Sequence, residues 1–262
     1  DTLQRKMIHA YNPACPVITP NIDRLADRSV VFSQHYIGSA PCMPARRDIL
    51  TGRLNFLERN WGPIEPFDVT FPSLLRRNGV FSHIVTDHYH YAELGGEGYL
   101  PQYNTWEMIR GQESDPWVSR VAEPVFPEQF AGRVVRQNLL NRTQFHADAD
   151  YPTPKTFASA VQWLRDNQGA DNFFLQVEVF DPHEPFESSE EFQKLKLEKN
   201  IADFNDLEHW MIKLLVCGEN GKYEKSSVAE ELSNEFDEIM IDECQDINET
   251  QNMIFKMLSR NE

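Results

Sequence analysis

The residues best suited to chemistry are a cysteine and an arginine four positions apart. Cys42 and Arg46 lie in a segment with prolines at 41 and 44, which is typical of the first turn of a helix, where a missing N–H costs no hydrogen bond. The i,i+4 spacing puts both side chains on one helix face. That end of a helix attracts anions because its N–H groups are unpaired and its dipole is positive. The pattern predicts a nucleophile beside a cation that holds an oxyanion, with a small buried cysteine in a Pro/Arg-rich loop as the alternative.

Helices and strands must position this pair. Apolar residues at 157, 160, 161 and 164 mark one face of a helix that precedes an apolar strand at 173–179. Alternating helices and strands imply an α/β fold with a mostly parallel sheet flanked by helices. Residues 91–154, rich in Pro, Gln, Arg and aromatic side chains, predict a long irregular stretch.

The motif Cys-x-Pro-x-Arg at 42–46, followed by Leu-Thr-Gly-Arg at 50–53, resembles the signature of the type I sulfatases, which are formylglycine-dependent and alkaline-phosphatase-like. Other stretches follow the order of that family: 1–5, a helix at 19–26, a strand at 30–36, 70–75, a strand at 80–85 and 180–186. The resemblance covers about residues 1–194. It implies that Cys42 is oxidised to formylglycine, whose hydrated aldehyde supplies the attacking oxygen, and that Arg46 holds this residue and the anionic oxygens of the ester.

The family resemblance also assigns polar residues that follow two strands. It implies that His90 or His183 aids the leaving group, and that Asp181 lies near the sulfate. The family usually has Gly-Lys-Trp-His where residues 86–90 read Thr-Asp-His-Tyr-His, so His88 replaces the lysine that contacts sulfate. Carboxyl ends of strands are where α/β proteins form sites, although a polar loop with satisfied hydrogen bonds is the alternative.

The resemblance further implies a calcium ion, for which Asp1 and modified Cys42 are the candidate ligands. Calcium takes six or more oxygen ligands. The family's partner aspartate on the first strand and its later Asp-Asn or Asp-His pair are not found in this sequence. We therefore expect a truncated sulfatase-like portion that lacks its first strand, its native N-terminus and part of the metal site.

The sequence changes character near residue 195. Asp-Glu-Cys-Gln-Asp at 242–246 resembles the Walker B box of UvrD/AddA-type DNA helicases, over about residues 199–262. The resemblance implies that Asp242 and Glu243 bind magnesium and ATP in a complete helicase. No Gly-x-x-x-x-Gly-Lys-Ser/Thr loop occurs in the sequence to hold the phosphates. We expect domains at 1–194 and 195–262, the second a small α/β helicase-like fragment with helices near 203–215 and 250–258 and a short strand at 239–241.

Charge and cysteine content limit the partners. The chain of 262 residues has a formal net charge of −16, which argues against direct contact with nucleic acid or an anionic membrane. Four cysteines predict no disulfide framework, and no apolar run approaches a membrane span. The location stays open between cytoplasm and periplasm.

Three kinds of function remain. The first is a sulfuric-ester hydrolase that acts on a sulfated small molecule or glycan after a formylglycine-generating maturation enzyme has acted, with a phosphonate or phosphodiester hydrolase as a close variant. The second is a fragment of an ATP-dependent DNA helicase/nuclease. The third is a chimeric, catalytically silent fusion. We expect this polypeptide to hydrolyse neither aryl sulfates with calcium nor ATP with DNA.

Overall fold

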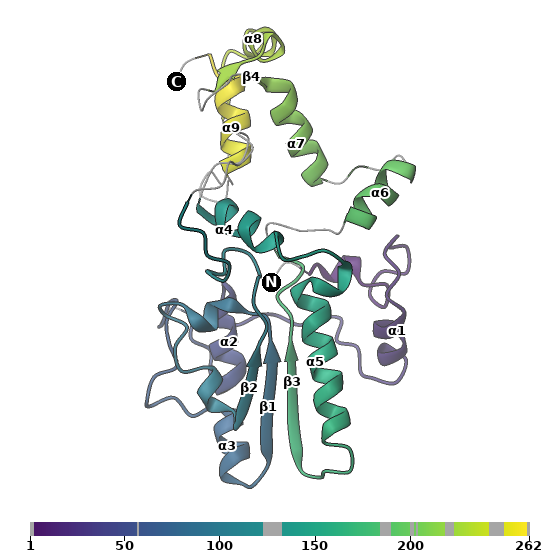
Figure 1. Cartoon of the computed structure of the whole chain (residues 1–262), viewed down its shortest axis with the longest axis vertical. Coiled ribbons are helices and arrows are strands. Elements are labelled where there is room, and N and C mark those ends of the chain that lie inside the picture. Colours follow the sequence, from purple (N-terminus) through teal and green to yellow (C-terminus); the bar gives the residue numbers. More distant parts are fainter. Residues whose placement is uncertain are drawn as a thin grey trace. The chain divides into compact units, whose positions relative to one another are not determined.

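The chain divides into two units in a computed structural model, and each is described by itself. The first comprises Asp1–Trp117 and Phe145–Glu184, and the second Val118–Gln144 and Pro185–Glu262 (Figure 1). The structure describes residues 3–56, 58–122, 133–183, 190–199, 202, 204–217, 223–240 and 249–260. The predicted boundary near residue 195 remains a prediction.

A parallel sheet organises the first unit. Its strands are β1 (Phe81–Thr86), β2 (Thr105–Met108) and β3 (Phe173–Glu178), in the order β2-β1-β3. β1 pairs with both neighbours, with His83 opposite Thr105 on one side and Leu175 on the other. Because side chains alternate along a strand, the register gives the sheet two distinct faces.

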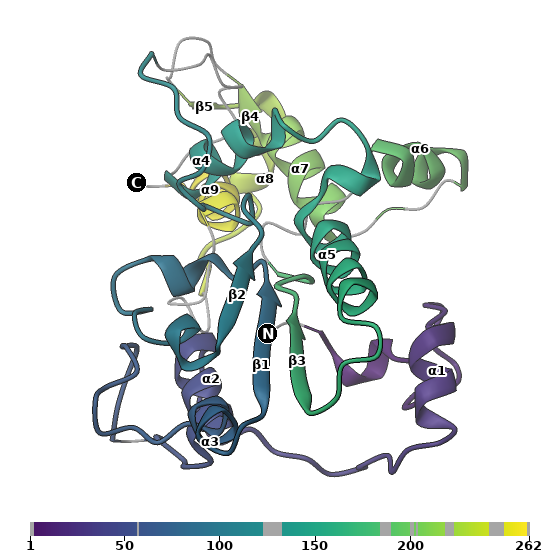
Figure 2. The same cartoon turned by 60° about the horizontal axis from the view of Figure 1, so that its bottom comes forward.

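Helices cover both faces of this sheet. On one face, Ile84 of β1 packs in a core with Met43 and Leu50 of α2 (Cys42–Thr51), and Phe71 of α3 (Phe71–Arg77) and Phe174 pack against that core. On the other face lies α5 (Pro152–Asp166), whose Trp163 ring stacks on His83 at 5.1 Å. Figure 2 shows α2 and α3 on one side of the strands and α5 on the other. The predicted α/β fold with a parallel sheet flanked by helices is confirmed.

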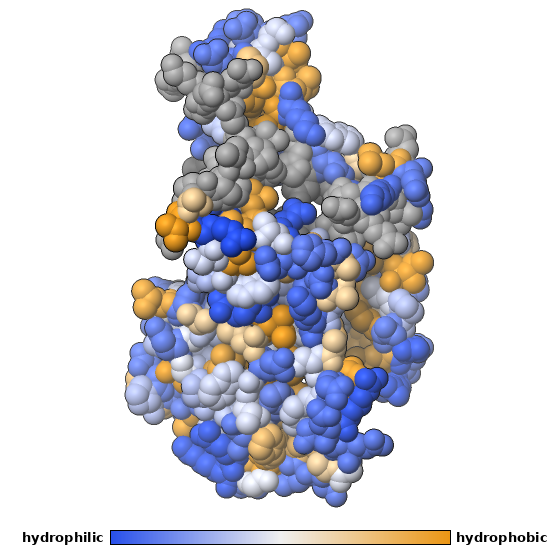
Figure 3. Space-filling model, viewed as in Figure 1, coloured by the Kyte–Doolittle hydropathy of each residue, from blue (hydrophilic) through white to orange (hydrophobic). Residues whose placement is uncertain are grey.

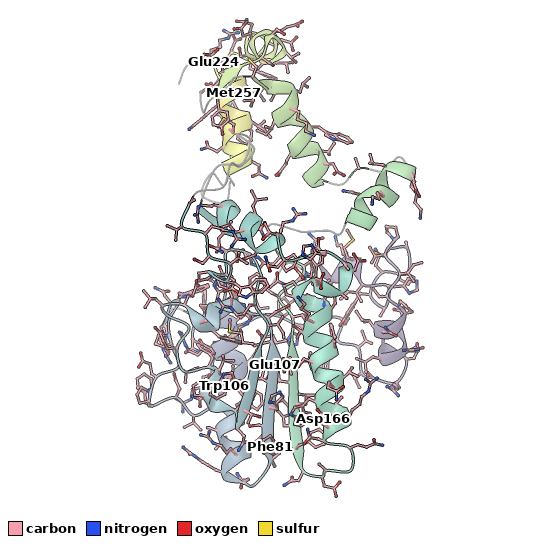
Figure 4. All side chains as sticks on the ribbon, viewed as in Figure 1. Phe81, Trp106, Glu107, Asp166, Glu224 and Met257 are labelled. Atoms are coloured by element: carbon pink, nitrogen blue, oxygen red, sulfur yellow. The ribbon has the colours of Figure 1, made fainter. Side chains whose placement is uncertain are left out.

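Polar contacts also fix α5 to the sheet. Glu107 of β2 lies on the α5 face, since it is in register with Val85, and Ser159 of α5 donates to its Oε2 at 2.5 Å (Figure 4). Figure 4 also labels Asp166, the last residue of α5. The remaining elements of this unit are α1 (Pro20–Ala26), η1 (Arg5–Met7), η2 (Tyr89–Ala92), η3 (Leu100–Gln102) and η4 (Asp148–Asp150).

Three sequence-based expectations are corrected. Residues 30–36 form no strand, and Val30 and Tyr36 are 78% and 82% exposed, because no strand of the described sheet pairs with them. Residues 91–154 are not wholly irregular, since they contain β2 and α4 (Arg133–Arg142). Residues 239 and 240 lie outside any strand, with Met240 86% exposed.

The second unit is mainly helical. Its elements are α4, α6 (Glu190–Lys199), α7 (Phe204–Leu215), β4 (Val216–Cys217), β5 (Glu224–Lys225), α8 (Ser227–Ser233) and α9 (Glu249–Leu258). Leu215, Ala229 and Met257 form its core, so the two predicted amphipathic helices are confirmed as α7 and α9. Trp210 of α7 remains 51% exposed, and Figure 3 shows hydrophobic residues at the surface of this unit among hydrophilic ones.

In the described part of the chain, we find no helix with the length and hydropathy needed to cross a bilayer.

Candidate active site

Cys42 is the first residue of α2, as the sequence predicted. The helix ends at Thr51, and Gly52 follows in the left-handed conformation that favours glycine, with its N–H bonded to the Asp48 carbonyl. The Cys42 side chain is 4% exposed and belongs to the apolar core beside α2. Burial raises the pKa of the thiol above its ordinary value, although the Arg46 charge acts to lower it. Cys42 is therefore a neutral thiol at neutral pH rather than a thiolate nucleophile.

Arg46 lies one turn along the same helix and is held by a carboxylate from β3. Its Nε donates to Glu178 Oε1 at 2.5 Å, and both side chains are 14% exposed. Burial acts to lower the pKa of Arg46, but the facing Glu178 carboxylate outweighs it and the pKa is raised. The guanidinium is thus a fixed cation whose charge is balanced within the protein.

Glu178 also receives uncharged donors. The Tyr91 hydroxyl lies 3.1 and 3.0 Å from its two carboxylate oxygens, and Gln176 Nε2 donates to Oε2 at 3.1 Å. Glu178 lies on the α2 face because it is in register with Thr86, two residues after Ile84. Sequence analysis did not identify Glu178, which lies 132 residues from Arg46. The only signal was its place at the end of an apolar strand.

The three predicted histidines surround one aromatic ring. The ring centroid of Phe180, just after β3, lies 4.9 Å from that of His88, 5.6 Å from that of His90 and 4.1 Å from that of His183. His88 also contacts the Tyr91 ring at 4.9 Å. Because Tyr91 and Arg46 bind the same carboxylate, the histidine cluster adjoins the pair on α2. The structure therefore brings the predicted histidines together.

His88 is fully buried, and neither of its ring nitrogens has a hydrogen-bond partner within the described ranges. Burial lowers its pKa, and the positive charge of Arg46 lowers it further. The imidazole is therefore neutral, with one N–H to donate and one nitrogen that can accept. A buried polar group without a partner costs free energy unless a ligand satisfies it.

His90 has carboxylates on both sides of its ring. Nδ1 bonds Glu93, and Nε2 lies 3.8 Å from Glu113 Oε2. Burial lowers the pKa of His90, against the Glu93 carboxylate, which raises it. The Glu93 contact fixes the orientation of the ring, as a second partner does for many histidines that transfer protons.

Asp181 lies in a buried polar network that sequence analysis did not predict. Its Oδ2 accepts from Thr153 Oγ1 at 2.7 Å and from Gln112 Nε2 at 3.0 Å. The same two donors lie 3.3 and 3.2 Å from Oδ2 of Asp87, which is fully buried. Burial raises the pKa of Asp87 to about 6, and the Asp181 charge acts in the same direction. Asp87 stood in the strand-end motif, but nothing in the sequence pointed to its partners.

The remaining predicted site residues, Asp1, Asp242 and Glu243, lie outside the described residues. Among the residues that are described, no group of three or more His, Cys, Asp or Glu side chains could hold a metal ion. The described residues thus do not by themselves fit the expected calcium site, of which only Cys42 is described.

Comparison with known proteins gives two different results. The family model described as Sulfatase matches residues 1–254, which extends beyond the predicted boundary near 195. The crystal structure of a phosphonate monoester hydrolase of Agrobacterium radiobacter is similar with a TM-score of 0.52 and 20% identity, over 72% of this chain and 41% of that chain. At that identity the likeness shows the fold.

Short partial matches connect the chain to another class of protein, the large (A-type) polypeptide of bacterial ATP-dependent helicase/nucleases. The protein of this name from Lysinibacillus sphaericus (strain C3-41) is 39% identical over 74 residues, and that from Clostridium perfringens (strain SM101 / Type A) is 43% identical over 75 residues. Each match covers 28% of this chain, and the chain spans 6% of the length of each of these relatives.

Proposed function

Because the chain belongs to the sulfatase family, and is thus a hydrolase of the alkaline-phosphatase-like superfamily, we propose that it is a sulfuric-ester hydrolase whose nucleophile is a formylglycine made from Cys42. The observation that carries this proposal is the Cys42 thiol at the first turn of α2, kept neutral by burial and lying near the Arg46 charge. A neutral, buried thiol is a poor nucleophile, whereas a hydrated aldehyde at the same position supplies a hydroxyl beside a cation.

The proposed chemistry uses groups on three elements. A hydroxyl oxygen of the hydrated residue 42 attacks sulfur, the bond from sulfur to the ester oxygen breaks, and the alcohol leaves with a proton from His90 or His183. Arg46 stabilises the charge that develops on the sulfuryl oxygens. Because Glu178 already binds Arg46 at 2.5 Å, a bound ester shares this guanidinium with a carboxylate.

His88 is suited to hold the substrate rather than to transfer protons. Its imidazole is neutral and fully buried, and within the described chain its ring nitrogens lack partners. One N–H donated to a sulfuryl oxygen would satisfy the group without bringing a second positive charge next to Arg46. We infer that His88 takes the place of the lysine that the family uses, with Asp181 acting nearby.

The family also makes a divalent metal ion part of the proposal, with calcium as the expected ion and Asp1 and modified Cys42 as the expected ligands. The metal would supply Lewis-acid stabilisation of the anionic ester. Since the described residues do not complete such a site, none of the steps above depends on the ion.

A phosphonate monoester is the second candidate substrate. The structural neighbour is a phosphonate monoester hydrolase with the same fold, and phosphonates and sulfates are both tetrahedral anions. The sulfated small molecule or glycan, the maturation enzyme and the domain boundary near 195 remain proposals of the same standing. An ATPase function is not proposed, because the sequence has no phosphate-binding loop.

Mass spectrometry of the peptide that contains residue 42 tests the proposal. The chain is produced with and without a formylglycine-generating enzyme, and the Cys42→Ala variant is the control. We expect conversion of the thiol to the aldehyde only with that enzyme, and a chain that keeps an unmodified thiol under these conditions contradicts the proposal. Assays with 4-nitrophenyl sulfate and with a phenyl phosphonate monoester then assign the substrate class by turnover above the control.

A further inference from the structure

The buried network around Asp87 and Asp181 joins the two loops that carry the histidines. Asp87 directly follows β1 and precedes His88, whereas Asp181 follows β3 and lies two residues before His183. Two donors bridge the carboxylates: Gln112 from the loop after β2, and Thr153 from the first turn of α5. The network therefore ties three strand ends and a helix together.

We propose that Asp87 and Asp181 share a single proton and act as a positioning pair, which holds the histidine-bearing loops after β1 and β3 around Phe180. In this arrangement Asp87 is a carboxylic acid and Asp181 is a carboxylate. The proton on Asp87 Oδ2 is donated to Thr153 Oγ1, and the Thr153 hydroxyl proton is donated to Asp181 Oδ2.

The number of available protons supports this assignment. The Gln112 amide has two N–H groups and can donate to both carboxyl oxygens, but the Thr153 hydroxyl has one proton and can donate to one of them. Since Thr153 Oγ1 lies 2.7 Å from Asp181 Oδ2 and 3.3 Å from Asp87 Oδ2, one of the two contacts needs a proton from a carboxyl group. A single proton on Asp87 satisfies all four contacts.

The distances place the negative charge on Asp181. Hydrogen bonds to an ionised acceptor are shorter than those to a neutral one. Both donors lie closer to Asp181, at 2.7 and 3.0 Å, than to Asp87, at 3.3 and 3.2 Å. Asp87 is fully buried, and burial disfavours an ionised carboxyl group.

The pair reaches the histidines through the backbone of Phe180. The Phe180 N–H donates to Asp87 Oδ1 at 2.7 Å, and the Phe180 ring contacts His88, His90 and His183. A second negative charge on the pair would repel Asp181 and loosen the loop that begins at Phe180. The pair is therefore a positioning device and makes no contact with the reacting atoms.

Other ionisable groups on the packed segments must be separated from the pair in any titration. They lie on the same loops and on the first turns of α5, and each has another described neighbour: His88 and His183 against Phe180, Arg110 and Asp115 with each other, and Lys155 over Phe145. Asp181 is the charged group that acts directly on Asp87.

Infrared spectroscopy of the full chain with ¹³C-labelled aspartate tests the shared proton. At about pH 5 we expect a carboxylic-acid C=O band, which disappears as the pH rises through about 6, the pKa of Asp87. The band should be lost in Asp87→Asn and kept in Asp171→Asn, a matched control at an exposed position. Wild-type chain without such a band at about pH 5, or Asp87→Asn that retains it, overturns the proposal, and the wild-type spectrum decides even if the variant does not fold.

Two further readouts test positioning. The ring resonances of His183 should shift with the Asp87 titration in wild type and remain constant over that range in Asp87→Asn, since the amide keeps both the acceptor for Phe180 and the donor for Thr153. This readout needs no turnover, so it separates the pair from the proposed sulfatase function, on which only the next readout rests. In a chain converted at residue 42, aryl sulfate hydrolysis by wild type should fall severalfold across that titration relative to Asp87→Asn, and identical pH profiles contradict positioning.

Discussion

Replacing Glu178 with glutamine should destabilise the first unit and make its stability depend on sulfate. The substitution keeps the shape of the side chain and an oxygen that accepts from Tyr91, but it removes the charge that faces Arg46 at 2.5 Å. Loss of one partner of a buried ion pair costs about 3–5 kcal/mol. Because each side chain retains 14% exposure, we expect about 2–3 kcal/mol, which lowers Tm by roughly 4–12 °C.

Sulfate should reverse part of this loss. An anion that binds the folded state stabilises it by mass action, and in Glu178→Gln the Arg46 cation no longer has this carboxylate as a competitor. Thermal unfolding is measured with increasing sodium sulfate against sodium chloride of equal ionic strength, for wild type, Glu178→Gln and Glu107→Gln. Glu107 is the matched control, since it lies on the opposite face of the same sheet and bonds Ser159.

Two results would refute this reasoning. If Glu178→Gln unfolds at the wild-type temperature, the carboxylate does not stabilise Arg46. If sulfate raises Tm equally in Glu178→Gln and Glu107→Gln, the anion does not bind at Arg46. An Arg46→Gln/Glu178→Gln double variant completes the cycle, and it should be more stable than Glu178→Gln alone because no uncompensated charge remains.

The other predictions concern ionisation, capping and access. Asp87 has a pKa raised from 3.8 to about 6, so wild type should lose about 3 kcal/mol of unfolding free energy as the pH rises from about 4 through about 6; urea unfolding should show no such loss in Asp87→Asn, and parallel curves would contradict it. Thr70 caps α3 by accepting from the Ser73 N–H, so Thr70→Ala should cost about 1 kcal/mol or more in the same assay. Cys42 is buried and Cys217 exposed, so a thiol reagent should label Cys217 much faster in the folded chain, and equal rates would show that Cys42 is accessible.

Local patterns were enough to predict the elements but not all of their ends. The helix at Cys42 follows from Pro41 and Pro44 before it and Gly52 after it, and these signals act within one turn. The strand expected at 30–36 has the right apolar residues, but in the described chain no strand lies beside it, and Val30 is left 78% exposed. Strand formation depends on pairing with distant residues, which a single sequence does not specify.

The same distinction applies to the site. Cys42 and Arg46 could be paired from their spacing, and the histidines could be placed because they follow strands. The partners that set their charge state could not, since Glu178 joins Arg46 across 132 residues and Asp87 joins Thr153 across 66. These contacts arise only when the strands take their register and α5 covers the second face.

Register therefore determines the chemistry as much as the motif does. Glu178 faces α2 because Ser82 is paired with Phe174, and Phe71 packs on Phe174 at 5.3 Å on that face. A one-residue slip of β3 would turn Glu178 to the α5 face, leave Arg46 without this counter-charge, and move Phe180 away from the Asp87 carboxylate. Substitutions at Phe71 or Phe174, which bear no reactive group, should for this reason alter the site as strongly as substitutions of the residues that line it.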